Sequence, residues 1–343
     1  MLAQVYQAYD QTPTLASVPI PDCPPGAVVV RVRATGVCRS DWHAWRGHDP
    51  VPLPMIPGHE FAGEVAQVGD GVTGYAVGDR VTAPFACGCG RCEWCASGNA
   101  HVCPNQYQPG FTGNGSFAEF VMVPAAETNL VRLPDSLSYP AAAALGCRFA
   151  TSWRAVKDQG RLQSGEILAV FGCGGVGLAA VMIGRALGAR VVALDVSTEA
   201  LALAEALGAE PLHAGNLDAA VDILIEHTGG AHVGIDALGS PALAAASVRS
   251  LRRRGRHIQV GLLLGEDAKA PLPLDRVIGW ELEILGSHGM PAVDYPAMLA
   301  LIAEGRLDPE RLVGRTIGLG EAGAALAAMD GPTPPGLTVV ALD

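Results

Sequence analysis

The chain carries the stretch ILAVFGCGGVG at residues 167–177. Five consecutive apolar residues predict a buried strand, and three glycines at the spacing GxGxxG follow it directly. An apolar segment to about residue 187 then predicts a helix, and residues 190–194 predict a second strand that ends at Asp195. A strand, a tight turn, a helix and a second strand in this order predict a parallel βαβ unit.

The three glycines and the acidic residue form the fingerprint of a dinucleotide-binding turn. Gly172 permits the tight turn, Gly174 lets backbone N–H groups approach a pyrophosphate, and Gly177 lets helix and strand pack closely. Asp195 would accept hydrogen bonds from the adenosine ribose and repel a 2′-phosphate, which favours NAD over NADP. The alternative is a glycine-rich turn that binds nothing. The predicted cofactor-binding residues here are Gly172, Gly174, Gly175, Val176, Gly177 and Asp195.

The alternation of strands and helices continues beyond Asp195. It predicts a doubly wound, mostly parallel sheet of six strands. We interpret the basic run Arg252–Arg254 as a solvated helix end and not as a phosphate site. The expected helices cover about 198–207, 217–227 and 241–251, and the strands that we can locate after Asp195 cover 233–237, 257–260 and 283–286.

The first part of the chain has the pattern of a β-rich module with long loops. Residues 27–33 form its clearest strand, 36–57 are rich in proline, and 60–81 have the pattern of strands and turns. Residues 117–123 predict another strand, and 141–145 the start of an alanine-rich helix. Near the end of the chain, we expect helices at about 294–304 and 321–329 and a last strand at 337–342.

Two groups of residues have the chemistry of metal ligands. Cys38 and His59 are soft donors that Zn²⁺ prefers, but two ligands leave a site incomplete. A separate run places four cysteines at the spacing of a closed tetrahedral shell, which leaves no position for a substrate and predicts a structural zinc. Buried or disulfide-paired thiols are the alternative, and we regard the nearby Cys87 and His101 as bystanders. The four predicted structural ligands are Cys89, Cys92, Cys95 and Cys103.

Composition and charge exclude several classes of function. A net charge of −11 argues against a nucleic-acid backbone as the main partner, and no apolar run is long enough for a membrane span. The first residues lack the basic and apolar regions of a secretory signal, so we expect a cytoplasmic location. Nine cysteines in such a chain then favour metal ligands over disulfides.

Taken together, the motifs resemble the zinc-dependent medium-chain alcohol dehydrogenases, and the resemblance covers essentially the whole chain. It implies an α/β protein in which a GroES-like, β-rich catalytic domain (1–148 and 290–343) encloses a Rossmann NAD-binding domain (149–289). The order and spacing of the blocks carry the resemblance: GVCRSDWH (36–43), GHE (58–60), CGRCEWC (89–95) with Cys103, ALGC (144–147), GCGGVG (172–177) with Asp195, GLLLG (261–265) and EILGS (283–287).

The resemblance also implies roles for single residues. Cys147 would join Cys38 and His59 as ligands of a catalytic zinc with an open fourth position, so that the chain would hold two zinc ions. Ser40 would receive the substrate proton, which would pass through the nicotinamide ribose to His43. The remaining implied roles are contact with the cofactor pyrophosphate for Arg39, support of His59 for Asp41, a transient or alternative zinc ligand for Glu60, and packing at the nicotinamide end for Thr151.

The function implied by the resemblance is reversible transfer of a hydride between an alcohol and NAD, which yields an aldehyde or a ketone. Phe85, Trp42 and Trp45 flank the expected site in sequence and favour primary or unhindered secondary alcohols, including aromatic ones; ordinary packing is the alternative, above all for the two tryptophans. A dimer or tetramer of identical chains is also implied. Three alternatives stay open: a zinc-free quinone or enoyl reductase, a zinc polyol, formaldehyde or threonine dehydrogenase, and a non-catalytic zinc- and nucleotide-binding scaffold or redox sensor.

Overall fold

The computed structural model describes residues 1–342, which form two compact units. Unit 1 contains Met1–Ala150 and the segment from Gly289 onward, and unit 2 contains Thr151–His288. The two boundaries expected from the sequence lay after residues 148 and 289, within two residues of those of the units.

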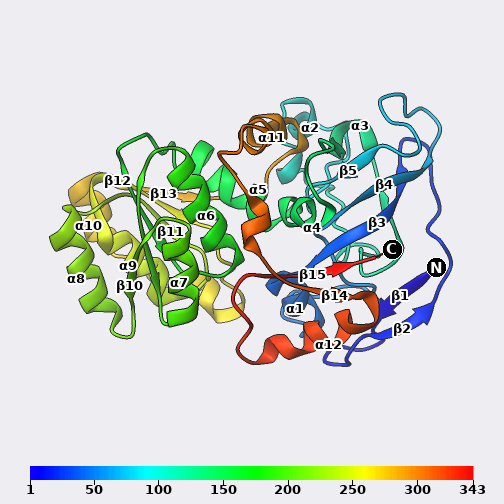
Figure 1. Cartoon of the computed structure of the whole chain (residues 1–343). Helices are drawn as coiled ribbons and strands as arrows, with labels where there is room; N and C mark the ends of the chain where they lie inside the picture. The colour runs from blue at the N-terminus through cyan, green and yellow to red at the C-terminus, as the bar shows by residue number, and fades with distance from the viewer. Residues whose placement is uncertain (343) are drawn as a thin grey trace. The chain divides into compact units, whose positions relative to one another are not determined.

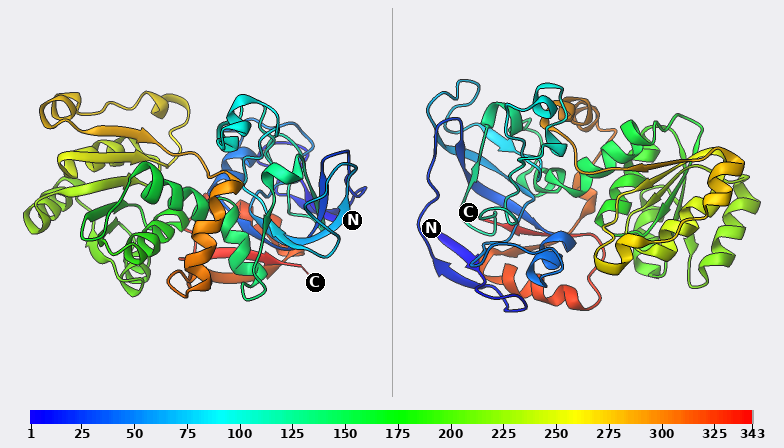
Figure 2. Two further views of the ribbon diagram at one scale, coloured as in Figure 1. Left: turned by 90° about the horizontal axis from the view of Figure 1, so that it is seen from above. Right: turned by 180° about the vertical axis from the view of Figure 1, so that it is seen from behind.

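Unit 2 is built on a six-stranded sheet in which every neighbouring pair of strands is parallel. The strand order β10-β9-β8-β11-β12-β13 is the order of a doubly wound dinucleotide-binding sheet. Figures 1 and 2 show helices on both faces of this sheet. Its strands and helices are β8 (Ile167–Phe171), α6 (Gly175–Ala186), β9 (Arg190–Asp195), α7 (Thr198–Ala206), β10 (Glu210–His213), α8 (Leu217–Thr228), β11 (Ala231–Asp236), α9 (Pro241–Ser250), β12 (Leu251–Gln259), α10 (Leu274–Trp280) and β13 (Glu283–Gly286).

The turn between β8 and α6 depends on two glycines. All five residues of β8 are buried, as expected of a central parallel strand covered on both faces. Gly172 follows with φ 96°, a conformation that residues with a Cβ rarely adopt. A Cβ on Gly177 would lie 1.8 Å from the carbonyl oxygen of Gly172, so only glycine lets α6 start this close to the strand.

Two features of unit 2 differ from the expectation. The sixth strand, which we could not locate from the sequence, is β10; it has no buried residue and lacks the apolar run by which the other strands were recognised. Our interpretation of Arg252–Arg254 as a helix end was wrong, because α9 ends at Ser250 and the arginines belong to β12.

Unit 1 contains a seven-stranded, mostly antiparallel sheet and a separate two-stranded sheet of β1 and β2. The last segment of the chain returns to the large sheet, where β15 pairs with β3. The elements are β1 (Leu2–Val5), β2 (Thr14–Ser17), β3 (Val28–Val37), α1 (Arg39–Trp45), β4 (Phe61–Val68), β5 (Arg80–Thr82), α2 (Glu93–Ala96), β6 (Phe120–Val123), α3 (Ala126–Asn129), β7 (Val131–Arg132), α4 (Tyr139–Ala143), α5 (Arg148–Trp153, across the sequence boundary), α11 (Tyr295–Ala303), β14 (Val313–Gly318), α12 (Ala322–Ala327) and β15 (Leu337–Ala341).

The ten-residue strand β3 is the centre of unit 1, since it pairs with β4, β6 and β15. Its valines at 28, 30 and 32 are fully or almost fully buried and pack with Phe61 and Val65 of β4 in one apolar cluster. Alternate side chains of a strand point to opposite faces, and the last four residues of β3, 34–37, are all buried, so both faces of its end are covered. This buried strand supports the loop that follows it at residue 38.

The elements of unit 1 also differ from the expectation in detail. The strand expected at 117–123 is shorter and begins at Phe120, and β14 at Val313–Gly318 was not expected. The alanine-rich helix α4 begins two residues earlier than expected, because the Ser138 hydroxyl accepts a hydrogen bond from the N–H of Ala141 and Pro140 occupies the first turn. These shifts leave residues 144–146 in place as a tight 3₁₀ turn before Cys147.

Candidate metal and cofactor sites

The pairing of β3 with β4 brings Cys38 next to His59. Thr35 lies opposite Phe61 in this antiparallel pair, and the N–H of Gly36 donates to the carbonyl oxygen of Glu60 at 2.7 Å. One residue beyond the end of β3, Cys38 therefore reaches the residues that lead into β4. Two residues separated by 21 positions meet because of strand register, which the apolar pattern of both strands determines.

Asp41 holds the imidazole ring of His59 in one orientation. Its Oδ1 lies 2.7 Å from His59 Nδ1 and also accepts the N–H of Gly58 at 3.0 Å, and both side chains are almost completely buried. A carboxylate accepts hydrogen bonds only, so Nδ1 carries a proton, and in the neutral ring Nε2 keeps its lone pair. Among the described residues His59 Nε2 has no hydrogen-bond partner. A buried imidazole nitrogen whose lone pair has no hydrogen-bond partner is suited to bind a metal ion.

Cys147 completes the group of donors around His59 Nε2. One ligand atom each from Cys38, His59, Glu60 and Cys147 lie within 4.8 Å of one another. Cys147 reaches this place because Gly146 packs closely: a Cβ on Gly146 would lie 3.0 Å from the carbonyl oxygen of Ala83. Two thiols and one imidazole are the donor set that zinc prefers, so these residues fit a zinc ion.

The electrostatics of the cluster favour a cation. The pKa of Cys38 lies well below that of a free thiol, chiefly because the Cys147 thiol donates a hydrogen bond to it, with further lowering by Arg148 and His59. Burial lowers the pKa of His59, but Asp41 and Cys38 outweigh burial and raise it well above its usual value. A metal ion competes with this proton for the same lone pair, since a ligating histidine must be neutral.

Glu60 lies beside these donors and is bound by an arginine that the sequence reading missed. The Arg148 guanidinium donates to both carboxylate oxygens of Glu60, with Nε at 2.9 Å from Oε1, and the backbone N–H of Arg148 donates to Oε1 at 3.0 Å. Burial raises the pKa of Glu60, and Arg148 opposes this shift. The position of a basic residue directly after Cys147 could have suggested a role at the site. Its pairing with Glu60 could not be predicted, because the two residues are 88 positions apart in the sequence.

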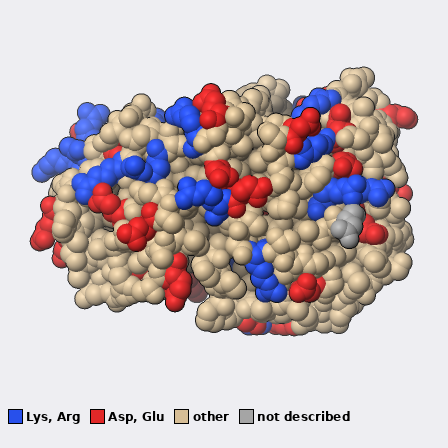
Figure 3. All heavy atoms as spheres, in the orientation of Figure 1, with Lys and Arg blue, Asp and Glu red and all other residues tan. Residues whose placement is uncertain are grey.

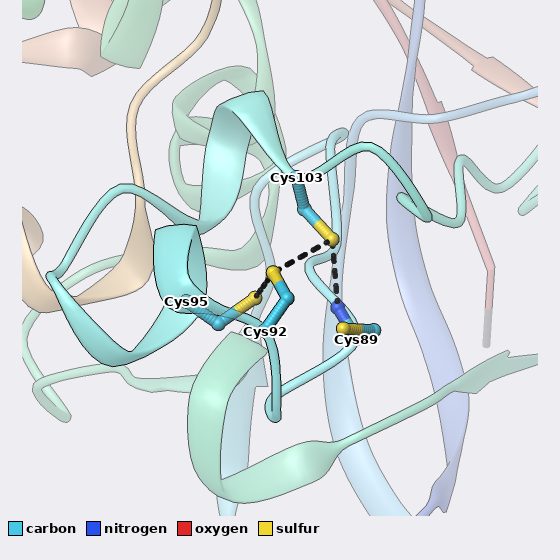
Figure 4. Close-up of side chains that lie close together, drawn as sticks. All are labelled: Cys89, Cys92, Cys95 and Cys103. Carbon is cyan, nitrogen blue, oxygen red and sulfur yellow. Dashed lines mark hydrogen bonds between the residues drawn. The ribbon is translucent and has the colours of Figure 1, made fainter.

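The second cysteine cluster is separate and more exposed (Figure 4). Cys92 Sγ lies 3.5 Å from Cys95 Sγ and 3.6 Å from Cys103 Sγ. These separations exclude S–S bonds of about 2.05 Å, and they are close to the roughly 3.8 Å expected of two thiolates that share a tetrahedral zinc with bonds of about 2.3 Å. Backbone N–H groups of Arg91 and Cys92 lower the pKa of Cys89 to about 6, which favours the thiolate. The four sulfurs thus fit a zinc ion, and Cys87 and His101 lie outside the group.

Three further polar residues of the GVCRSDWH block (36–43) lie on α1: Arg39, Ser40 and His43. Ser40 is half-buried, and His43 Nδ1 lies 3.2 Å from His48 Nδ1. Burial, His48 and Arg39 together lower the pKa of His43, so the ring is neutral near pH 7. The Arg39 guanidinium stacks 4.8 Å from the ring of Trp42, and its Nη1 donates to the carbonyl oxygen of Met329 at 2.5 Å.

In unit 2, the glycine turn and Asp195 lie at the carboxyl end of the parallel strands. A Cβ on Gly174 would meet no atom within 4 Å, so the approach to the backbone is open at this glycine. The N–H of Cys173 donates to Asp195 Oδ2 at 2.6 Å and the N–H of Ser197 to Oδ1 at 2.8 Å. A carboxylate has about four acceptor positions, so Asp195 retains capacity for a ribose diol. Thr151 Oγ1 is buried and has no hydrogen-bond partner within residues 1–342.

Among the described residues, no helix has the length and apolar character needed to cross a membrane.

Comparison with known families gives two matches within the chain. The alcohol dehydrogenase GroES-like domain matches residues 24–135, and the zinc-binding dehydrogenase domain matches residues 175–304. An alcohol dehydrogenase of Geobacillus stearothermophilus is 36% identical over 310 residues, which cover 90% of each chain.

The chain is also similar to solved structures over its full length. The chain is similar to a structure described as an NAD-dependent alcohol dehydrogenase, with 30% identity, a TM-score of 0.90 and coverage of 100% of both chains. It is also similar to an alcohol dehydrogenase from Thermus sp. ATN1, with 31% identity, a TM-score of 0.92 and the same coverage. With a GroES-like unit, a doubly wound parallel sheet and a buried cysteine–histidine donor set, the chain belongs to the zinc-dependent medium-chain alcohol dehydrogenase family.

Proposed function

We propose that the protein oxidises an alcohol reversibly to an aldehyde or ketone, with zinc at Cys38, His59 and Cys147 and with NAD at the glycine turn. The observation that carries the proposal is the buried Nε2 of His59, which has no hydrogen-bond partner among the described residues and lies close to two thiols. A structural zinc site would have four protein ligands and no open position, and a metal-free reductase would not need a set of metal ligands. The family relatives named above support the reaction class, and the turn at Gly172–Gly177 with Asp195 supports the cofactor.

Each bound group supplies one kind of chemistry. Zinc supplies Lewis-acid chemistry, which lowers the pKa of an alcohol hydroxyl toward neutrality. NAD supplies the acceptor of the hydride. The chain's own part is to hold the donor set in one geometry: Asp41 orients His59 through the hydrogen bond to Nδ1, and Arg148 neutralises the charge of Glu60 behind the ligands.

In this proposal, Ser40 and His43 carry the proton away. The Ser40 hydroxyl can accept and donate at once, so it suits a position between the substrate hydroxyl and a base. His43 is a suitable terminal base because its lowered pKa keeps the imidazole neutral near pH 7. We assign Arg39 and Thr151 to the cofactor and Glu60 to an alternative ligand position, as the family resemblance implies.

The proposed substrates are primary or unhindered secondary alcohols, including aromatic ones. Two phenylalanine rings pack against the edge of the His59 ring: Phe111 at 5.3 Å and Phe85 at 6.0 Å between centroids. Apolar aromatic rings beside the donor set favour an apolar substrate body over a polyol, whose hydroxyls would lose hydrogen bonds to water.

A substrate panel with NAD tests the proposal. We expect turnover of primary, small secondary and benzylic alcohols, and kcat/KM values for polyols, L-threonine and hydroxymethylglutathione that are lower by about 10-fold or more, since each unpaired polar group is costly to bury. Initial rates of NADH formation measure this. Preference for a polyol or threonine would refute the substrate class, and NADH binding without turnover of any alcohol would refute the enzyme.

We propose that each chain holds two zinc ions and that they differ in role. Cys38→Ser should remove one zinc and lower activity by about 10³-fold or more while the protein stays folded. Cys92→Ser should remove the other zinc and lower Tm by roughly 10 °C or more, because this shell ties a loop together. Metal content per chain, Tm and kcat are measured together for both variants.

The matched control is Cys23→Ser, since Cys23 lies outside both clusters. This variant should keep both zinc ions, its Tm and its activity. Full turnover by Cys38→Ser, or an unchanged Tm in a Cys92→Ser protein that has lost zinc, would contradict the assignment.

The proton relay predicts a pH dependence. A neutral His43 accepts the proton, and its pKa is lowered from 6.5, so kcat for alcohol oxidation should fall only as the pH drops below about 6.5. His43→Gln should lower kcat at pH 7 by about 10-fold or more and abolish this acidic inflection. The exposed variant His213→Gln serves as the control and should retain the wild-type profile; an unaltered inflection in His43→Gln would disprove the relay.

We propose further that identical chains associate as a dimer or tetramer. Strand β13 is the last strand in the sheet order of unit 2, and within residues 1–342 it pairs with β12 alone, so its outer edge can accept another strand. Apolar side chains near it are exposed: Ile278 by 80%, Leu274 by 61% and Ile284 by 37%. A free strand edge beside exposed apolar residues favours association through this edge.

Light scattering after size-exclusion chromatography tests this association. Wild type should have the mass of two or four chains, and Ile278→Lys combined with Ile284→Lys should reduce it by at least one association step, since a charge is costly to bury unpaired. Val77→Lys, at a site 68% exposed in unit 1, is the control and should retain the wild-type mass. A wild-type monomer would refute the proposal, and an unchanged mass in the double variant would exclude the β13 edge.

A further inference from the structure

The start of β12 contains a bulge that carries three adjacent arginines. In the pairing of β11 with β12, Ala231 lies opposite Leu251, but Val233 already lies opposite Arg256. Residues 252–255 therefore lie opposite the single residue His232, and the extra chain bends out of the sheet. Arg254 adopts φ 60°, which is uncommon for a residue with a Cβ.

A small cavity lies at this bulge, and its wall is rich in hydrogen-bond donors. Its volume is about 280 Å³, just below the range of sites for drug-sized ligands, so it suits a small group. In Figure 3, blue Lys and Arg atoms gather over the part of unit 2 where Figure 1 draws β12 and α10. The residues that line the cavity are Glu166, His232, Arg252, Arg253, Arg254, Arg256 and Glu283.

Both carboxylates of the cavity are already engaged. Glu166 accepts from Arg256 Nη2 at 2.7 Å and from the N–H of Gln163 at 2.9 Å. Glu283 accepts from Arg161 Nη2 with both oxygens at 2.7 Å. In the part of the chain that the structure describes, Arg252, Arg253 and Arg254 form no ion pair within 4.0 Å, so the cavity has a surplus of positive charge.

His232 provides the decisive observation. Its Nδ1 accepts the N–H of Ile167 at 3.0 Å, so the proton of the neutral ring is on Nε2. Yet Nε2 lies 2.8 Å from Nη1 of Arg252, and a guanidinium can only donate. Moving the proton to Nδ1 would set it against the N–H of Ile167 instead. Whichever tautomer is present, one N–H group faces another donor, and an acceptor that lies beside both groups would resolve the conflict.

We propose that this cavity binds a phosphate-type oxyanion, either inorganic phosphate or the phosphate of a phosphomonoester. Two oxygens of such a group would accept from His232 Nε2 and the Arg252 guanidinium, and Arg254 would add a charge-assisted hydrogen bond from the bulge. The carboxylate of a metabolite is a poorer fit, because it carries a single negative charge, whereas a phosphate group carries up to two against the surplus of positive charge here.

This site is distinct from the cofactor site in unit 2. The cavity lies at the amino ends of β8, β11, β12 and β13, whereas Gly172 and Asp195 lie at the carboxyl ends of β8 and β9. The length of β8 alone separates the two edges by roughly 13 Å. Oxyanion binding at the bulge and dinucleotide binding at the glycine turn are therefore compatible, and the inference does not depend on the proposed reaction.

Calorimetric titration with inorganic phosphate tests the site in the purified, metal-loaded protein, at an ionic strength held constant with sodium acetate. We expect one saturable site per chain that persists in the presence of saturating NADH. His232→Asn retains an acceptor for the N–H of Ile167 but removes Nε2, and it should weaken this binding by about 10- to 100-fold, as should Arg254→Gln. Arg254→Lys keeps the charge but loses the planar guanidinium, which can donate two parallel hydrogen bonds. Its affinity for phosphate should lie between those of wild type and Arg254→Gln.

Lys269→Gln removes a positive charge from unit 2 outside the cavity and should bind phosphate as wild type does. Titration with glycerol 3-phosphate distinguishes the two sources: tighter binding than inorganic phosphate identifies a phosphomonoester as the ligand, and weaker binding identifies free phosphate. Absence of saturable binding in wild type would overturn the proposal, as would equal binding by folded His232→Asn, Arg254→Gln and wild type. Folding is checked by circular dichroism and Tm, and if His232→Asn does not fold, the two Arg254 variants decide.

Discussion

The hydrogen bond between Asp41 and His59 is the constraint on which the metal centre depends. Asp41 is 1% exposed, and its carboxylate accepts from His59 Nδ1 and from the backbone N–H groups of Gly58 and Cys38. Burial of a carboxylate is costly unless its oxygens accept hydrogen bonds. Here the donors are the ring of the zinc ligand His59 and the backbone N–H groups at or beside the two ligand positions. One side chain thus fixes the tautomer of the imidazole and ties together the two loops that carry Cys38 and His59.

Strand register decides whether Asp41 can act in this way. A shift of one residue between β3 and β4 would turn the buried valines of β3 toward the wrong face, so the apolar pattern locks the pairing that places Cys38 beside His59. The third donor arrives by a different route. Two hydrogen bonds hold the 3₁₀ turn at 144–146: the N–H of Phe85 donates to the Gly146 carbonyl, and the Tyr295 hydroxyl donates to the Leu145 carbonyl. The position of Cys147 therefore depends on packing around this turn and not on the pairing of two strands.

The sequence predicted those features whose cause is local. The β8–α6 turn follows from glycine stereochemistry, and the Cys89–Cys103 group follows from spacing along a short loop. Features with a distant cause were missed. β10 has no apolar run and forms only because β9 offers it an edge, and Arg148 reaches Glu60 across 88 positions. The arginines of β12 were misread for the same reason, since a bulge is a property of two paired strands and cannot be seen in one.

The two edges of the sheet in unit 2 show two physical ways to attract an anion. At the carboxyl edge, backbone N–H groups and the α6 dipole carry partial charges that need no desolvated cation, so glycine is the residue that matters and the site can sit in a chain of net charge −11. At the amino edge α8, α9 and α10 end, and the free carbonyl groups of helix C-termini disfavour an anion, so whole guanidinium charges must supply the attraction. Such charges repel one another when crowded, and the bulge gives three arginines separate positions opposite one histidine, where the proposed oxyanion would offset their repulsion.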